Sequence, residues 1–249
     1  MEQGDSLKPG ILLLFPAGSR PTADDIERLL AAPESGIPAR VSHRPEAGED
    51  WLELLVSGLT FDLRGLSPAD PVPGTDASHA YGFADGAPQG GLEAVQIVAG
   101  RHVASGSGLE PVVRMMVNLA ANLVLHLPVA AVAWQPAHTV MEPRYFSRIA
   151  FNWLSGGAFP ALGLTALTPV SDGSVASAGL SHFIGQEMHL EGREGEPQAD
   201  SVKLAIRLID YFTRHGPLTE PLTIDDGSDV LLAEPSRAGR RIRIWREEA

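Results

Sequence analysis

The stretch from residue 109 to residue 134 constrains the fold more than any other part of the sequence. Its sequence, LEPVVRMMVNLAANLVLHLPVAAVAW, predicts one long helix that is apolar on most sides and ends at Pro128. Such a helix must lie inside a packed layer, because any exposed side would put apolar side chains in water. The segment 129–134 is apolar without alternation, which is typical of a strand at the centre of a sheet. The middle of the chain is therefore predicted to be core.

Length and composition are those of an ordinary globular protein. The chain has 249 residues, of which 44% are hydrophobic and 20% charged, so it can bury a sizeable core. It has no cysteine, which excludes disulfides, thiolate metal sites and a cysteine nucleophile. This composition fits a reducing compartment, and we expect a cytoplasmic protein. The glycines around Ser107 lack the rest of a dinucleotide or phosphate-loop motif, so no cofactor is predicted.

Charge and polarity narrow the classes of partner. The chain has 31 acidic and 19 basic residues, a formal net charge of −12. Proteins that bind nucleic acid need a positive surface, so that class is disfavoured. The run 115–134 is long enough to span a bilayer, but Asn118, Asn122, His126 and Pro128 interrupt it, which is rare in spanning segments. We therefore expect that the protein neither binds nucleic acid nor associates with a membrane. We favour another protein as its partner. The sequence assigns no oligomeric state.

The remaining elements follow a similar order in each half of the chain. In the first half we expect strands at 11–15, 40–43, 51–64, 94–98 and 129–134, and helices from Thr22 to Pro33 and over 109–127. In the second half we expect a helix from Pro143, a hairpin of strands 162–170 and 175–190, a helix from Asp200 or Ser201, and strands at 229–233 and 241–245.

This order predicts an α+β fold. Each half is close to the split β-α-β unit of ferredoxin-like folds. We expect two such units to form one mixed or antiparallel sheet, with the helices packed mainly on one face. The chain, 1–249, would then be one compact unit of two similar halves, 7–134 and 135–246.

A long segment without periodicity, residues 65–92, separates two of the predicted strands. It is rich in proline, glycine and aspartate. Loops of this length are uncommon inside compact domains. We therefore expect the segment to be functional or mobile.

The strongest candidates for chemistry are His182, Glu187 and His189, in GLSHFIGQEMHLEG. Glu187 and His189 point to the same side of a regular strand, and a bulge at Gly185 would bring His182 to them. Two imidazoles and one carboxylate can hold zinc or iron(II). The competing interpretation is an exposed strand face with polar side chains, and we favour it because the spacing alone defines no ligand geometry.

Ser181 stands in a sequence that begins like the nucleophile elbow of hydrolases. The elbow needs a second glycine two residues after the serine, where this chain has Phe183. It also needs a turn from strand to helix, and both flanks here are predicted to be strand. Ser181 is therefore interpreted as an ordinary strand residue.

Arginine is concentrated near the end of the chain. Residues 237–246 include five arginines, and Arg241, Arg243 and Trp245 share one face of the predicted strand. An anionic partner is one explanation. We favour the other, an edge strand that charge protects from aggregation.

The second part of the chain resembles an uncharacterised bacterial domain-of-unknown-function family over about residues 90–215. The resemblance is carried by VAAVAW, by ALGLTALTPV and by a Gly-Leu-x-x-Phe-Gly-x-x-Glu block. The matching residues of that block are Gly179, Leu180, Phe183, Gly185 and Glu187, and Ile184 between Phe183 and Gly185 departs from it. The resemblance implies a bacterial cytosolic protein and assigns no activity or catalytic residue.

No motif in the sequence identifies an activity, so two hypotheses remain. The first is a non-catalytic, acidic binding protein that engages a basic partner protein, and neutralisation of that partner is one form of this hypothesis. It rests on the net charge and on the lack of a complete catalytic motif. The second is a small-molecule or metal-dependent hydrolase with His182, Glu187 and His189 as ligands. We favour the first.

Overall fold

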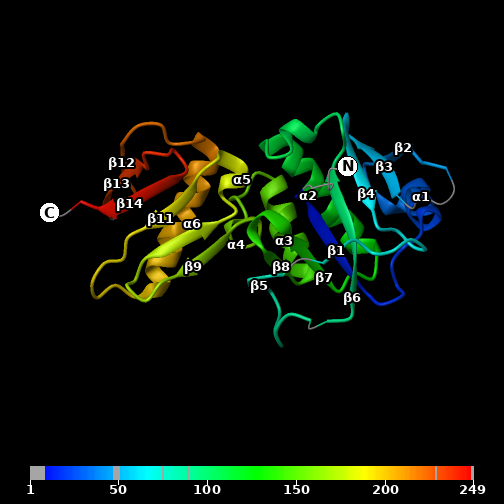
Figure 1. Ribbon diagram of the computed structural model, residues 1–249, viewed down its shortest axis with the longest axis horizontal. Coiled ribbons are helices and arrows are strands. Elements are labelled where there is room, and N and C mark those ends of the chain that lie inside the picture. Colours follow the sequence, from blue (N-terminus) through cyan, green and yellow to red (C-terminus); the bar gives the residue numbers. More distant parts are fainter. Residues whose placement is uncertain (1–8, 47–50, 75, 89, 228, 248–249) are drawn as a thin grey trace, which may run out of the picture. The chain divides into compact units, whose positions relative to one another are not determined.

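The computed structural model describes residues 9–46, 51–74, 76–88, 90–227 and 229–247 (Figure 1). The chain divides into two compact units: unit 1 comprises 1–135 and 140–155, and unit 2 comprises 136–139 and 156–249. In the described part, the strands form two mixed or antiparallel sheets, one of eight strands and one of six. The α+β class is therefore confirmed, but the prediction of a single shared sheet is wrong.

The eight-stranded sheet has the order β2-β3-β4-β6-β1-β7-β8-β5. Its strands are β1 (Ile11–Pro16), β2 (Arg40–His43), β3 (Trp51–Val56), β4 (Leu59–Arg64), β5 (His79–Tyr81), β6 (Leu92–Ala99), β7 (Ala131–Trp134) and β8 (Thr139–Met141). β1 is antiparallel to both β6 and β7, and β6 is antiparallel to β4. All four residues of β7 are buried, and β7 lies between β1 and β8, as expected of a central strand.

Among its described residues, unit 1 has the helices α1 (Ala23–Ala31), α2 (Glu110–His126) and α3 (Pro143–Leu154). α2 packs on β1 and β6 and against α3, which explains why it is apolar on most sides. α3 had been expected in the second half, but it packs on α2 and β7 instead. The three 3₁₀ turns are η1 (Pro33–Ser35), η2 (Ala104–Gly106) and η3 (Gln135–Ala137).

The single strand predicted over 51–64 is wrong, because a turn divides it into β3 and β4. Ser57 and Gly58 both have positive φ, 49° and 86°. This conformation suits the two-residue turns that join antiparallel strands, since its twist matches that of the strands. The turn allows Leu54 to pair with Phe61.

Hydrogen bonds from Arg20 and the packing of Val72 hold the first part of the long segment after β4 in place. Arg20 Nε lies 2.8 Å from Glu93 Oε2, and the same guanidinium donates to the carbonyls of Gly65 and Ala69. Val72 packs on the buried cluster of Leu12, Ala94 and Ala133, which lies on the sheet face that also carries Leu14. At least this part of the segment is ordered by its packing.

Unit 2 contains the six-stranded sheet, in the order β12-β13-β14-β11-β10-β9. Its elements are α4 (Ala161–Leu164), β9 (Ala166–Pro169), β10 (Val175–Ala178), α5 (Ser181–Ile184), β11 (Glu187–Leu190), α6 (Gln198–His215), β12 (Leu222–Asp225), β13 (Val230–Pro235) and β14 (Arg241–Arg246). All neighbours are antiparallel except β11 and β14, which are parallel. β14 is thus an inner strand, and its prediction as an edge strand is wrong.

The predicted strand 175–190 is also wrong, because the helical turn α5 interrupts it. Gly179 and Gly185 flank α5 with φ of 85° and 76°. Both values lie in the left-handed region that favours glycine, so the two residues let the chain leave β10 and enter β11. The β9–β10 hairpin around Asp172 and Gly173 is confirmed.

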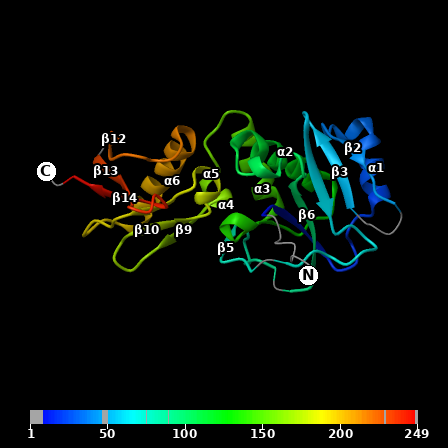
Figure 2. The same cartoon turned by 45° about the horizontal axis from the view of Figure 1, so that its top comes forward.

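The sheet of unit 2 has one covered face. α6 packs along β9, β10 and β11 (Figure 2). Its buried side chains include Leu204, Leu208 and Phe212. Burial alternates along β14: Ile242 and Ile244 are fully buried, whereas Arg241 and Arg243, which alternate with them, are exposed. Alternate residues of a strand point to opposite faces, so the arginines lie on the open face. We call the side that carries Arg241, Arg243 and Trp245 the open face.

No helix in the described ranges is both long and apolar enough to cross a membrane.

A capping box starts α1 and provides a test of the local sequence signals. Thr22 Oγ1 accepts the backbone N–H of Asp25, and the Asp25 carboxylate accepts the backbone N–H of Thr22. The hydrogen bond from the Thr22 backbone is the main cause that lowers the pKa of Asp25.

Thr22→Ala is expected to lower the free energy of unfolding by about 1 kcal/mol, since it removes the side chain that caps α1. Denaturant unfolding followed by circular dichroism measures the change. Thr219→Ala, at an exposed loop position, is the control and should unfold like the wild type. Equal stability of both variants would contradict the role of the cap.

Candidate functional site

Glu187, one of the three predicted metal ligands, is used inside unit 2 as a hydrogen-bond acceptor. Its carboxylate accepts Ser177 Oγ at 2.5 Å, Gly179 N at 2.9 Å and Ser181 N at 3.0 Å. Three donors therefore converge on this one side chain, which ties the end of β10 and the start of α5 to β11. The arrangement is a structural clamp.

The two histidines of the predicted cluster lie on different elements. His182 is on α5, where its ring meets that of Phe183 edge to face at a centroid distance of 5.3 Å. His189 is on β11, in register with Ala176 and Arg243. Within the described ranges, no group of three or more His, Asp or Glu side chains is placed to hold a metal ion. The structure thus gives the predicted ligand set no common site.

The glycine-rich block around these residues has a structural explanation. A Cβ at Gly179 would lie 2.5 Å from the Cβ of Ala137, so no larger residue fits. Phe183 packs edge to face on Phe159, with ring centroids 5.0 Å apart. Gly185 ends α5 in the left-handed region. The block therefore builds the turn that Glu187 closes.

Ser181 lies at the start of α5, so a strand and then a helical turn do flank it, contrary to the expectation of strand on both sides. Its side chain is exposed, and its backbone N–H is bound to Glu187. The serine thus contributes its backbone to the clamp.

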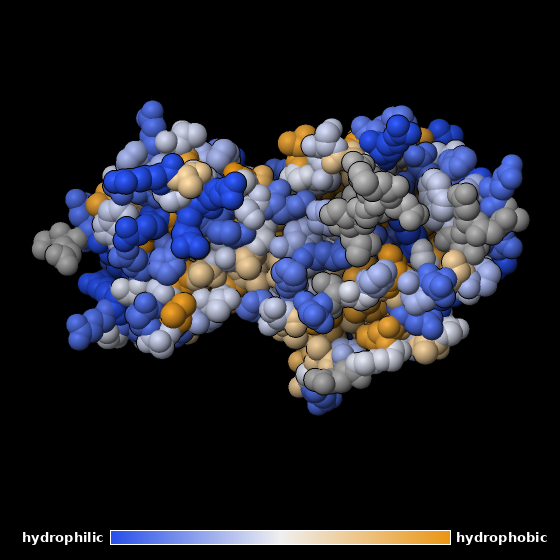
Figure 3. All heavy atoms as spheres, viewed as in Figure 1, coloured by the Kyte–Doolittle hydropathy of each residue, from blue (hydrophilic) through white to orange (hydrophobic). Residues whose placement is uncertain are grey.

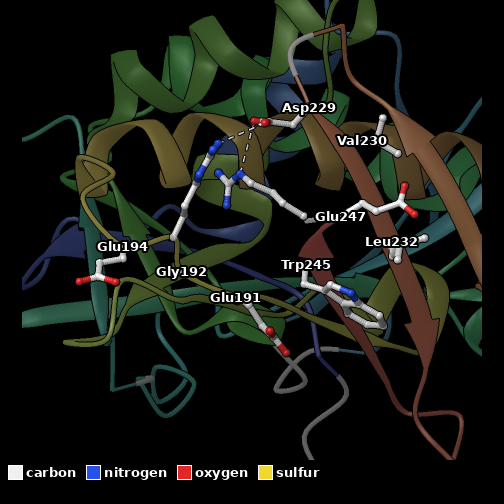
Figure 4. A pocket seen from close by; sticks show the side chains of 10 residues that line it. Glu191, Gly192, Glu194, Asp229, Val230, Leu232, Trp245 and Glu247 are labelled. Carbon is white, nitrogen blue, oxygen red and sulfur yellow. Dashed lines mark hydrogen bonds and ion pairs between the residues drawn. The ribbon is translucent and has the colours of Figure 1, made fainter. Parts of the chain in front are cut away.

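Unit 2 has a groove of about 1060 Å³ at one end of β13 and β14 (Figure 4). We call it the acidic groove. Three segments supply its lining: the loop between β11 and α6, the start of β13, and the end of β14. The lining residues are Glu191, Gly192, Arg193, Glu194, Asp229, Val230, Leu232, Trp245, Arg246 and Glu247.

The floor of the acidic groove is apolar. Leu232 and Trp245 are cross-strand partners of β13 and β14 on the open face, and Figure 4 shows their side chains beside each other. Val230, two residues before Leu232 on the same face, is 41% exposed. An aliphatic and aromatic floor of this kind offers contact area to the apolar part of a ligand.

One wall of the groove is a network of charged side chains that is mostly withdrawn from water. Arg246 is 10% exposed and donates to both carboxylate oxygens of Glu196, at 2.6 and 2.7 Å. Asp229 lies 3.4 Å from Arg246 Nε and 3.3 Å from Arg193 Nη1. Bidentate pairing of this type fixes geometry as well as charge. The network therefore holds the three lining segments together.

The rim of the groove is acidic. The lining holds four carboxylates, Glu191, Glu194, Asp229 and Glu247, and two guanidinium groups. Asp229 belongs to the wall network, and Glu191 accepts Arg243 Nη2 at 2.6 Å. Among the residues that the structure describes, Glu194 and Glu247 have no ion-pair or hydrogen-bonded side-chain partner. The groove can thus receive a cation that carries an apolar stem.

A second hollow lies in unit 1, with a volume of about 470 Å³. Phe83, Val124 and Leu125 contribute apolar side chains to it. The carboxylate at this site, that of Glu142, accepts the backbone N–H of Tyr145 and so caps α3. This hollow lacks the uncommitted carboxylates of the acidic groove.

The sequence pattern pointed to part of the groove. Arg241, Arg243 and Trp245 were expected on one strand face, and the alternation of burial along β14 confirms this. Glu191, Asp229 and Leu232 were not expected in a site. Glu191 comes to Trp245 because β11 pairs with β14 in parallel, and Leu232 and Asp229 do so because β13 pairs with β14. Local sequence patterns do not report these long-range pairings.

Comparisons with protein-family models, with curated proteins and with solved structures found no match for the chain.

The clamp around Glu187 can be tested by Glu187→Gln. The backbone N–H groups of Gly179 and Ser181 share Glu187 Oε1, so the amide oxygen can still accept both. The amide replaces the other oxygen, which accepts Ser177 Oγ, by an NH₂ donor, and it removes the negative charge that strengthens all three bonds. We expect unit 2 to lose about 2–3 kcal/mol of unfolding free energy.

Chemical denaturation measures this loss, with Glu220→Gln as the matched control because Glu220 is exposed in the same unit. A Glu187→Gln protein as stable as the control would show that the clamp contributes nothing.

Proposed function

We propose that this protein is a non-catalytic binding protein that captures a basic protein partner in the acidic groove. The observation that carries the proposal is the combination of an apolar floor with uncommitted carboxylates at its rim. Basic proteins present lysine and arginine side chains, whose long apolar stems end in a cation. The floor of Leu232 and Trp245 would receive the stem, and Glu194 and Glu247 the charge.

The overall charge of the chain supports the same proposal. A net charge of −12 attracts a basic partner from a distance and raises the rate of encounter. Hydrophilic residues cover most of the visible surface of unit 2, and small apolar patches interrupt them (Figure 3). Contacts to a few aromatic and aliphatic side chains inside a charged rim are typical of protein interfaces.

The lining of the groove argues against hydrolysis at this site. Its ten residues include no serine, threonine, histidine, lysine or tyrosine in the described part. Histidine is the commonest general base, and serine and threonine are common nucleophiles. The lining therefore supports the binding of cations and of apolar groups more directly than a serine- or histidine-dependent hydrolysis.

For unit 1 we propose the role of a scaffold with a ferredoxin-like core, in a bacterial cytoplasmic protein. The strand order β4-β6-β1-β7, antiparallel throughout, supports a split β-α-β arrangement, with α1 after β1 and α2 between β6 and β7. β2 and β3 would extend this core at one edge, and β8 and β5 at the other.

The proposal is tested with a short synthetic peptide in which basic residues alternate with leucine. We expect isothermal titration calorimetry to detect binding that weakens as ionic strength rises. Salt screens the attraction between charges, and the Debye length is about 8 Å at physiological ionic strength. A peptide with glutamate in place of the basic residues should not bind. If the basic peptide does not bind, the proposal is wrong.

Trp245→Ala removes the largest part of the floor. We expect it to weaken binding of the basic peptide by about 10-fold or more, because a central aromatic contact dominates small interfaces. Circular dichroism should show unchanged folding, since the side chain lies on the open face.

The combined change Glu194→Gln and Glu247→Gln tests the rim. We expect binding about 3- to 10-fold weaker, with a reduced dependence on salt. Glu220→Gln, compared with each of the single changes Glu194→Gln and Glu247→Gln, is the control for the loss of one charge. This control should leave the affinity for the peptide nearly unchanged, because Glu220 lies near the opposite end of β11 from the groove. Its neighbour Leu218 is hydrogen-bonded to Gln186, which precedes β11, whereas Glu191 of the groove follows β11. Equal loss in control and rim variants would contradict a site at the groove.

A further inference from the structure

Arg243 lies beside the acidic groove and contacts two of its lining residues. Its guanidinium carbon lies 5.9 Å from the centre of the Trp245 ring, and its Nη2 lies 2.6 Å from Glu191 Oε1. Both partners line the groove, whereas Arg243 itself reaches it from the open face of β14. A guanidinium between an aromatic face and a carboxylate is the arrangement that an arginine of a bound protein would adopt.

We propose that the groove recognises an arginine side chain of the partner, and that Arg243 is an internal stand-in which this arginine displaces. The inference rests on the proposed function and names the chemical group that the groove selects. In the free protein Arg243 would satisfy Glu191 and cover Trp245. In the complex the arginine of the partner would take both contacts.

The contacts of Arg243 are weak enough to be exchanged. The side chains of Arg243 and Glu191 are 61% and 39% exposed, so water competes for both groups. Exposed ion pairs contribute little to stability. By contrast, Arg246 in the wall is 10% exposed and bound to both oxygens of Glu196, so it would stay in place. Only one of the two arginines at this end of β14 is therefore exchangeable.

A displaced Arg243 has another carboxylate beside it. Glu234 is its cross-strand partner on β13 and is exposed on the same face. Directly opposed residues of antiparallel strands lie within reach of an ion pair. The exchange would thus leave no cation without a counter-charge.

Arginine is favoured over lysine by the shape of the site. A planar guanidinium can stack on the indole of Trp245 while it donates hydrogen bonds in its plane to Glu191. An ammonium group is a compact charge that cannot stack in this way. The groove should therefore discriminate between two side chains of equal charge.

Removal of the stand-in gives the test. Arg243→Gln should bind a peptide of alternating arginine and leucine about 2- to 5-fold more tightly than the wild type, because no internal group competes for Glu191 and Trp245. Arg241→Gln is the matched control: it removes the same charge from the same face of β14, two residues away, whereas the contacts to Glu191 and Trp245 are made by Arg243. Its affinity should stay near that of the wild type. An equal gain in peptide affinity in both variants would contradict the proposal that a bound arginine displaces Arg243.

The same titrations with altered peptides test the choice of side chain. The wild type should bind the arginine peptide about 3- to 10-fold more tightly than the lysine peptide and should not bind the citrulline peptide, which is similar in shape but uncharged. Trp245→Ala should abolish the preference for arginine. Equal binding of the arginine and lysine peptides would overturn the selection of a guanidinium while leaving the proposed function intact. Failure of both peptides to bind would overturn both proposals.

Discussion

Strand β14 can bury only one of its faces, and the candidate site depends on which face is covered. Ile242 and Ile244 are fully buried, so Arg243 and Trp245 must point the other way. If β14 were shifted by one residue, the isoleucines would lie in water and the arginines in the core. The burial of two aliphatic side chains thus fixes the position of the aromatic floor.

The acidic groove also requires that three segments distant in sequence meet at one end of β14. β11 runs parallel to β14, so the loop that follows β11 starts beside the end of β14. The pair between Arg246 and Glu196 joins β14 to the loop before α6. Asp229 adds the start of β13. The groove is consequently held by well-ordered strands and a largely buried ion-pair network, although much of its rim comes from a loop.

This arrangement separates structural from recognising charges. Arg246 and Glu196 are nearly buried and satisfy each other, and removing one would leave the other without a partner. Glu194 and Glu247, on the rim, have no such task in the described part of the chain. Glu187, like Glu196, stabilises the fold, because three hydrogen-bond donors converge on its carboxylate. A carboxylate in a suggestive sequence pattern thus serves the fold, and less conspicuous ones line the groove.

The local elements could be predicted where one sequence signal decides the conformation. The apolar length of α2, the cap at Thr22 and the turn at Asp172 and Gly173 are such cases. The turn at Ser57 and Gly58 was missed because apolar residues continue on both sides of it. The single-sheet prediction failed because the pairing of β7 with β1, and of β11 with β14, is decided by long-range packing.

The candidate site was predictable only in part, for the same reason. Alternation along β14 placed Arg243 and Trp245 on one face, as the structure confirms. It could not bring Glu191 or Asp229 to them, since these residues lie on other segments. His182 lies in the helical turn α5, whereas Glu187 and His189 follow it on β11, and a strand pattern does not reveal that turn.

The most direct test of the acidic groove is a nuclear magnetic resonance titration of the isotopically labelled protein with the arginine–leucine peptide. The account predicts that the indole N–H signal of Trp245 and the backbone signals of residues 191–194 and 230–232 shift together. The indole signal of Trp134, which is fully buried in unit 1, should not move. Shifts confined to other surfaces, with the signal of Trp245 unchanged at saturation, would contradict it.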